Sequence, residues 1–156
     1  NGPSLKKMDI DFIKNEISFS VNSFFRYKNI NQWQPTYNLL LDPLLFVDAT
    51  VKESKFYKDL STLMPKTKLI APLYRGYSSL NNNKYLEEMD IYYTALGGSR
   101  AMDLDFCKVI PSMHGVGSYA LSAAIYTGCN PIYLIGFDHD YLANRGKMDH
   151  FYDQIC

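Results

Sequence analysis

The segment GVGSYALSAAIYTGCNPIYLIGFD, residues 115–138, carries the strongest indication of the fold class. It opens with a glycine loop and continues into a run of small residues, 119–127, which predicts a helix that ends at Gly128. The next run, 132–137, is almost wholly apolar, as expected of a buried parallel strand. A glycine loop, a helix and a buried strand in this order indicate a parallel α/β sheet.

Outward from this segment, helical and strand patterns alternate along the chain. Asp42-Pro43 ends one predicted strand, because proline cannot donate to a sheet ladder. We expect helices over 4–13 and 51–63 and strands over 17–22, 37–41 and 68–71, whereas 84–110 is ambiguous. The expected fold is a three-layer Rossmann-like α/β sandwich with a mainly parallel sheet, and 156 residues predict a single domain over 1–156.

Composition excludes several classes of protein. Hydrophobic residues make up 47% of the chain, which argues against disorder, and sixteen basic residues balance sixteen acidic ones, so a nucleic-acid partner is not expected. Residues 1–78 nevertheless carry eleven Lys and Arg against seven Asp and Glu, enough to favour a small anion such as a nucleotide phosphate.

The sequence also indicates where the protein is located and whether the chain belongs to a longer one. No apolar run approaches the roughly 20 residues that span a bilayer, so we expect no transmembrane segment. Three widely spaced cysteines fit neither a disulfide framework nor a zinc site and favour a cytoplasmic location. The chain opens at Asn1, directly on a loop motif, which suggests a fragment of a longer chain.

Small, polar and acidic residues recur where predicted strands end or helices begin. The four segments that share this feature are 1–4, 20–23, 41–43 and 136–140. Ligands of open α/β sheets bind at the carboxyl ends of the strands, so these segments predict a nucleotide pocket. Glycine loops that lead into helices, at residues 1–4 and 115–118, would offer backbone N–H groups to a phosphate.

Candidate chemistry lies close to the last predicted strand. Asp138-His139-Asp140 matches the Asp-x-Asp element with which many glycosyltransferases hold a metal and a diphosphate, although Asp138 could instead cap the loop through local hydrogen bonds. His150 lies between Asp149 and Phe151-Tyr152-Asp153. Flanking carboxylates would raise its pKa and suit it to act as a general base, or it is a surface histidine among acids.

Taken together, these motifs resemble one superfamily. Asn1-Gly2-Pro3-Ser4-Leu5 is similar to the opening of bacterial sialyltransferases with a variant GT-A, Rossmann-like fold, and of the related MptE-like family, named for 6-hydroxymethylpterin diphosphokinase. Val21-Asn22 resembles the second motif of the superfamily, and Tyr37 to Pro43 resembles a strand of the MptE-like branch. Gly117 through Asp138 resembles the shared helix–strand signature.

The resemblance implies an inverting transfer of an acidic sugar from a CMP-activated donor to a glycan acceptor, with no cofactor required and no metal site. It implies that the nucleotide is bound by Asn1, Gly2, Ser4 and Asn22 and at the positions of Asp42, Gly115, Val116, Gly117, Ser118 and Asp138. It further implies that Tyr141 steadies the leaving phosphate. The base would be His150, with His139 as the alternative.

Two alternatives remain open. An MptE-like diphosphokinase would use Asp42, Asp138 and Asp140 to hold Mg²⁺ that bridges the phosphates of ATP. A non-catalytic nucleotide-binding domain would bind the same ligands without turnover. A magnesium requirement separates the first alternative from the sialyltransferase-like reaction, and tight binding without turnover marks the second.

Overall fold

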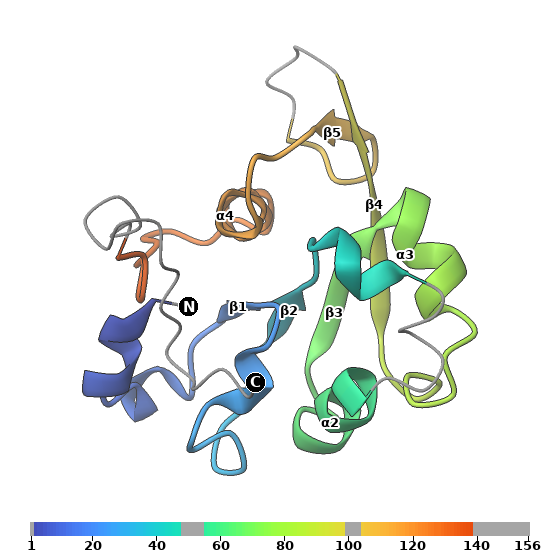
Figure 1. Cartoon of the computed structure of the whole chain (residues 1–156). Coiled ribbons are helices and arrows are strands. Elements are labelled where there is room, and N and C mark those ends of the chain that lie inside the picture. Colours follow the sequence, from blue (N-terminus) through green and yellow to red (C-terminus); the bar gives the residue numbers. More distant parts are fainter. Residues whose placement is uncertain (1, 48–54, 99–103, 139–156) are drawn as a thin grey trace, which may run out of the picture.

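The computed structural model describes residues 2–47, 55–98 and 104–138 and contains one all-parallel sheet (Figure 1). Its strands, in spatial order, are β1 (Phe19–Val21), β2 (Tyr37–Leu39), β3 (Lys68–Pro72), β4 (Ile91–Gly97) and β5 (Val109–Pro111). Three α-helices flank them: α2 (Lys55–Leu63), α3 (Leu73–Leu80) and α4 (Val116–Tyr126). The predicted Rossmann-like α/β class with a parallel sheet is confirmed.

Apolar clusters lie on both faces of the sheet, which explains why the strands are rich in apolar residues. In β3, Leu69 and Ala71 belong to one apolar cluster, whereas Ile70 belongs to another, because successive strand side chains point to opposite faces. The first cluster includes Tyr57 and Leu60 of α2, and the second is closed by small and aromatic residues of α4. The result is the three-layer arrangement expected of parallel sheets.

Helix α4 carries the chain back across the sheet. It follows β5 at one edge, yet it packs against β1 and β2 at the other. Ala120, Ala123 and Ala124 allow this close approach because they present only a methyl group. Residues 129–135 and Phe137 therefore emerge beside β1, and together with β1 they line a mainly apolar cavity of about 610 Å³.

The apolar run 132–137 is not a strand in this structure, so that prediction is wrong. The side chain of Tyr133 is 81% exposed and that of Leu134 54% exposed, while Gly136 has a positive φ of 70° that departs from the extended conformation. Its carbonyl accepts a hydrogen bond from Gly2, not from a neighbouring strand. An apolar run becomes a strand only if it finds a neighbouring strand for its backbone hydrogen bonds, and its composition does not show whether it does.

Two further elements differ from the sequence prediction. Residues 4–13 do not form one helix but two short 3₁₀ helices, η1 (Pro3–Lys7) and η2 (Asp11–Ile13), because Met8 between them is extended. Helix α3 was not predicted at all. Its apolar residues Leu73, Tyr77 and Leu80 do recur at helical spacing directly after Pro72.

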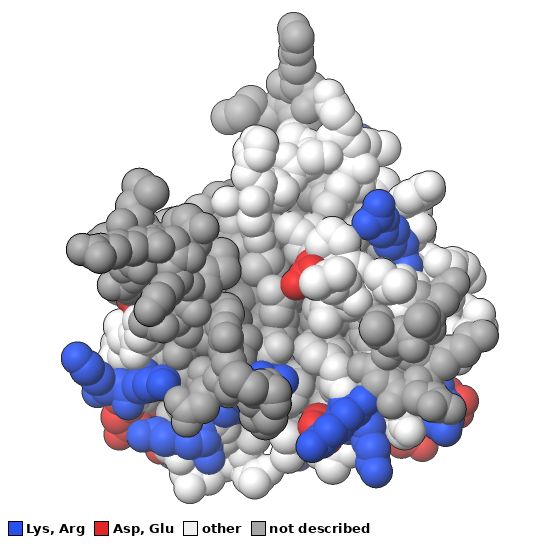
Figure 2. All heavy atoms as spheres, viewed as in Figure 1, with Lys and Arg blue, Asp and Glu red and all other residues white. Residues whose placement is uncertain are grey.

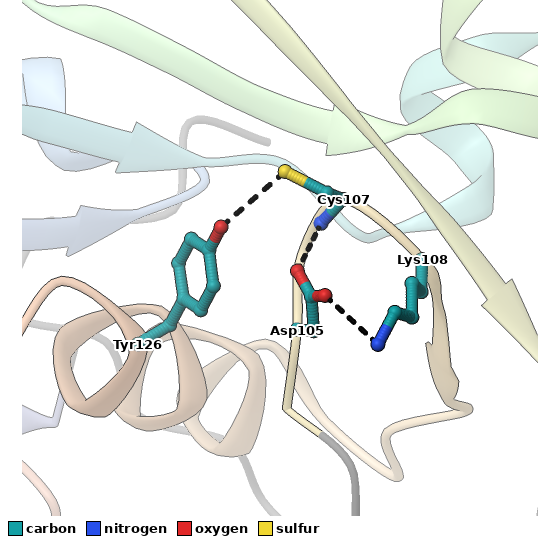
Figure 3. A network of polar contacts seen from close by, with 4 residues as sticks. All are labelled: Asp105, Cys107, Lys108 and Tyr126. Atoms are coloured by element: carbon teal, nitrogen blue, oxygen red, sulfur yellow. Dashed lines mark hydrogen bonds and ion pairs between the residues drawn. The ribbon is translucent and has the colours of Figure 1, made fainter.

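A small polar network ties the segment before β5 to the far end of α4 (Figure 3). Asp105 accepts a hydrogen bond from the Cys107 N–H at 3.0 Å and pairs with Lys108 Nζ at 3.2 Å. The Cys107 N–H, followed by Lys108, holds the pKa of the Asp105 carboxyl below its ordinary value. Cys107 Sγ lies 3.4 Å from the Tyr126 hydroxyl, so the network lies at the opposite end of α4 from Gly115.

Candidate functional site

The structure brings the first and last described segments together, although 132–137 is not a strand and the contact is therefore not made at a strand end. The Gly2 N–H donates to the Gly136 carbonyl oxygen at 2.8 Å. The Asp138 carboxylate accepts two hydrogen bonds from Ser4, from its backbone N–H at 2.8 Å and from its hydroxyl at 2.5 Å. Asp138 therefore anchors the opening loop across a separation of 134 residues.

Glycine is required on both sides of this junction. A Cβ atom at Gly2 would lie 2.3 Å from Asp138 Oδ2 and 2.6 Å from its Cγ. At Gly136 the backbone is left-handed, and a Cβ atom would lie 2.8 Å from two side-chain carbons of Leu5. A side chain at either position would force the two segments apart.

The first turn of α4 joins the same cluster through Phe137. A Cβ atom at Gly117 would lie 2.6 Å from Cε1 of the Phe137 ring, so glycine permits the ring to pack against the helix. Gly115 is the N-cap, and no side chain caps the turn there. A Cβ atom at Gly115 would meet no other residue within 4 Å, whereas Val116 packs against the apolar core and Ser118 is exposed. The first N–H groups of α4 have no side-chain cap, and such groups are suited to an anion.

Asn22, directly after β1, is held in an uncommon conformation. Its φ is 48°, a left-handed value that costs a non-glycine residue roughly 1–2 kcal/mol and is tolerated best by Asn and Asp. Its backbone is fixed to β2 on both sides, since its N–H donates to the Leu39 carbonyl at 2.8 Å and its carbonyl accepts from Asn38 Nδ2 at 3.1 Å. Its side-chain Oδ1 is buried and has no hydrogen-bond partner.

Asp42 follows the neighbouring strand β2 and begins η4 (Pro43–Phe46). Its Oδ1 accepts a hydrogen bond from the Leu44 N–H at 3.0 Å, so one of its oxygens caps this short helix. The side chain is exposed at the carboxyl edge of the sheet. Asn22 and Asp42 therefore lie at the ends of adjacent strands, as expected.

Basic residues accompany the opening loop. Lys6 and Lys7 belong to η1, the same short helix as Ser4, and both are exposed. Figure 2 shows Lys and Arg atoms over the region of η1 and η2, over α2 and near α3, with Asp and Glu atoms beside the two lower groups and one acidic group in the middle of this face. Positive charge thus lies beside the opening loop that carries Ser4.

Some predicted residues lie outside the described ranges: Asn1, His139, Asp140, Tyr141 and His150. Among the described residues, no three His, Cys, Asp or Glu side chains come close enough to hold a metal ion. The sequence analysis did not single out Asn38, and it included Ser20 only as part of the segment 20–23. Asn38 is a polar position inside the predicted strand 37–41, which is otherwise apolar, and that irregularity was the available signal.

The described residues form a Rossmann-like α/β domain in which the opening loop contacts Gly136–Asp138 and Phe137 packs against Gly117 of α4. Asn22 and Asp42 follow the neighbouring strands β1 and β2. Comparison with protein family models, curated proteins and solved structures gave no match. Within the part of the chain that the structure covers, no helix is long and apolar enough to cross a membrane.

Proposed function

We propose that the domain binds the nucleotide of a CMP-activated acidic sugar at this site and transfers the sugar to a glycan acceptor. The observation that carries the proposal is the junction of Gly2–Ser4 with Gly136–Asp138 next to the first turn of α4. This junction unites the two glycine loops suited to a phosphate. The resemblance of the same segments to donor-binding motifs of bacterial sialyltransferases supports CMP as the nucleotide.

Each described group has a definite task in this proposal. The uncapped N–H groups of α4 receive the phosphate, which Lys6 and Lys7 also attract. The carboxamide of Asn22 forms a hydrogen bond with the nucleotide. Asp138 keeps the opening loop in place through its two hydrogen bonds from Ser4, and we assign it no contact with the phosphate because two anions repel each other.

In the transfer step, the acceptor hydroxyl oxygen attacks the anomeric carbon while the bond from that carbon to the CMP phosphate oxygen breaks. His150 takes the proton of the hydroxyl, with His139 as the alternative base, and CMP leaves with the bonding electron pair. Tyr141 donates a hydrogen bond to the departing phosphate. Configuration at the anomeric carbon inverts because attack and departure occur on opposite faces.

Calorimetric titration with CMP, CDP, UDP and ATP, each with and without Mg²⁺, tests the proposal. We expect CMP to bind most tightly and without a metal requirement. Binding of ATP that depends on Mg²⁺ would replace the proposal with the diphosphokinase. Binding of CMP without sugar transfer would leave a non-catalytic nucleotide-binding domain, and silence from all four ligands would refute nucleotide binding.

Asn22→Gly provides a matched variant. Glycine adopts the left-handed φ of this position without penalty, so the fold and its melting temperature should be retained while the carboxamide is lost. Removing one ligand hydrogen bond weakens CMP binding by roughly tenfold. An unchanged Kd for CMP would show that Asn22 does not touch the nucleotide.

A further inference from the structure

Beneath the end of β1 lies a buried polar pair that the proposed reaction does not use. Asn38 of β2 is 0% exposed and Ser20 of β1 is 7% exposed, and the two occupy paired positions in the sheet. The Ser20 hydroxyl donates to Asn38 Oδ1 at 2.7 Å and lies 3.2 Å from the Tyr37 carbonyl oxygen. Polar groups at such positions are costly unless they are hydrogen-bonded, so apolar residues would be the simpler choice.

The pair is connected to the candidate site through a single residue. Asn38 uses its oxygen for Ser20 and its Nδ2 group for the Asn22 carbonyl at 3.1 Å, so its orientation is determined at both ends. The Asn22 N–H is bound to β2 as well, at 2.8 Å from the Leu39 carbonyl oxygen. Neither backbone group of Asn22 can therefore turn without breaking a bond to β2.

The presence of asparagine rather than glycine at position 22 indicates the purpose of these hydrogen bonds. Glycine would accept a φ of 48° more readily, and it would leave no buried oxygen without a partner. A position that requires only a chain reversal is better served by glycine. Asparagine together with a buried pair that fixes its backbone indicates that the direction of the carboxamide matters.

We propose that Asn38 and Ser20 are positioning residues that fix the left-handed backbone of Asn22, so that its carboxamide forms a hydrogen bond with a bound nucleotide. The ligand part of this inference rests on the proposed function.

Two substitutions of different severity test the pair. Asn38→Asp keeps the shape and the acceptor for Ser20 but removes the N–H group that binds the Asn22 carbonyl. Ser20→Ala is milder: it frees the Asn38 amide to rotate and keeps the experiment decisive if Asn38→Asp does not fold. We expect Ser20→Ala and Asn38→Asp to weaken CMP binding by roughly threefold to tenfold. Ser20→Thr retains the hydroxyl and should keep the affinity of the wild type for CMP.

The decisive readout is a double-mutant cycle with Asn22→Gly. If Asn38 and Ser20 act through Asn22, their substitution has no further effect on the Kd for CMP once the Asn22 carboxamide is absent. A pair that merely supports the fold would weaken binding equally in both backgrounds, and that result would overturn the proposal.

The ligand-free protein separates this inference from the proposed function. The backbone and Cβ chemical shifts of Asn22 report its left-handed conformation, and we expect Ser20→Ala and Asn38→Asp to shift them toward averaged values. Unchanged shifts would overturn the positioning role even if CMP binds. Shifts that change while the wild type binds no nucleotide would confirm the positioning role and refute the ligand and the proposed function.

Discussion

At the scale of single residues, the hydrogen bonds from Ser4 to Asp138 make a testable contribution to stability. Ser4→Ala removes the hydroxyl bond of 2.5 Å and leaves the backbone bond of 2.8 Å in place, so we expect a loss of about 1 kcal/mol. Gly2→Ala places a methyl group where the Asp138 carboxylate lies, so both bonds are broken and the loss is larger. Urea denaturation followed by the fluorescence of Trp33 measures both.

The control for this comparison is Ser78→Ala. Ser78 is an exposed serine of α3 whose hydroxyl lies 3.4 Å from the Arg75 carbonyl, a weak contact. Its substitution should change stability by less than about 0.5 kcal/mol. Equal losses for Ser4→Ala and Ser78→Ala would show that the Ser4–Asp138 junction does not hold the two segments together.

Residue-level prediction from sequence succeeded where a backbone requirement is visible in the residue type. Gly2 was predicted as a loop glycine, and the Asp138 side chain occupies the place of its Cβ atom. Gly117 was predicted in a loop but lies inside α4, where the Phe137 ring occupies that place. Asn38 was missed because its partners come from another strand, and strand pairing cannot be read from a local pattern.

At the scale of elements, the contact between α4 and Phe137 predicts that replacing a helix glycine by alanine lowers stability, whereas this change normally raises it. Gly117→Ala should raise helix propensity by up to ~1 kcal/mol, but its methyl group would lie 2.6 Å from the Phe137 ring. We therefore expect Gly117→Ala to destabilise the protein when Phe137 is present. In the Phe137→Ala background, the same substitution should be neutral or stabilising. Thermal unfolding of the wild type, the two single variants and the double variant gives the coupling free energy between positions 117 and 137.

Additive effects of the two substitutions would contradict that contact. The ring of Phe137 is 40% exposed, so part of the strain can be relieved by outward rotation, and the coupling should stay below about 2 kcal/mol. Nucleotide binding provides a second readout, because a displaced ring would alter the space beside the first turn of α4.

Elements were predictable from sequence where burial and periodicity agree. The cores of the strands at 17–22, 37–41 and 68–71 and of helix α4 were predicted, and each has a distinct apolar pattern. The run 132–137 has that composition without a ladder, because Gly136 turns the backbone and bonds the opening loop. An apolar composition indicates that a segment tends to be buried. It does not show which hydrogen-bond partners the segment has, because these are set by the tertiary structure.

At the scale of the whole molecule, Tyr57 and Tyr119, two of the buried tyrosines, predict how stability depends on alkaline pH. Burial raises the pKa of the Tyr119 hydroxyl to about 12, with a smaller opposing effect from its hydrogen bond with Thr94, and burial also raises the pKa of Tyr57. In the unfolded chain both hydroxyls ionise near pH 10. The folded state therefore binds these protons more tightly, and the stabilisation is complete below about pH 10.

As the pH rises above about 10, the unfolded chain loses these protons first, so the free energy of unfolding falls. The slope should be roughly 1.4 kcal/mol per pH unit for each tyrosine until its folded pKa is reached. Urea denaturation across this range measures the slope, and Tyr119→Phe should reduce it by the contribution of one hydroxyl. Because Tyr57 lies in the cluster with α2 and Tyr119 in the cluster with α4, the two slopes report opposite faces of one sheet. A slope unaffected by Tyr119→Phe would mean that the α4 face has already opened when the tyrosine ionises, and the two layers would then unfold separately.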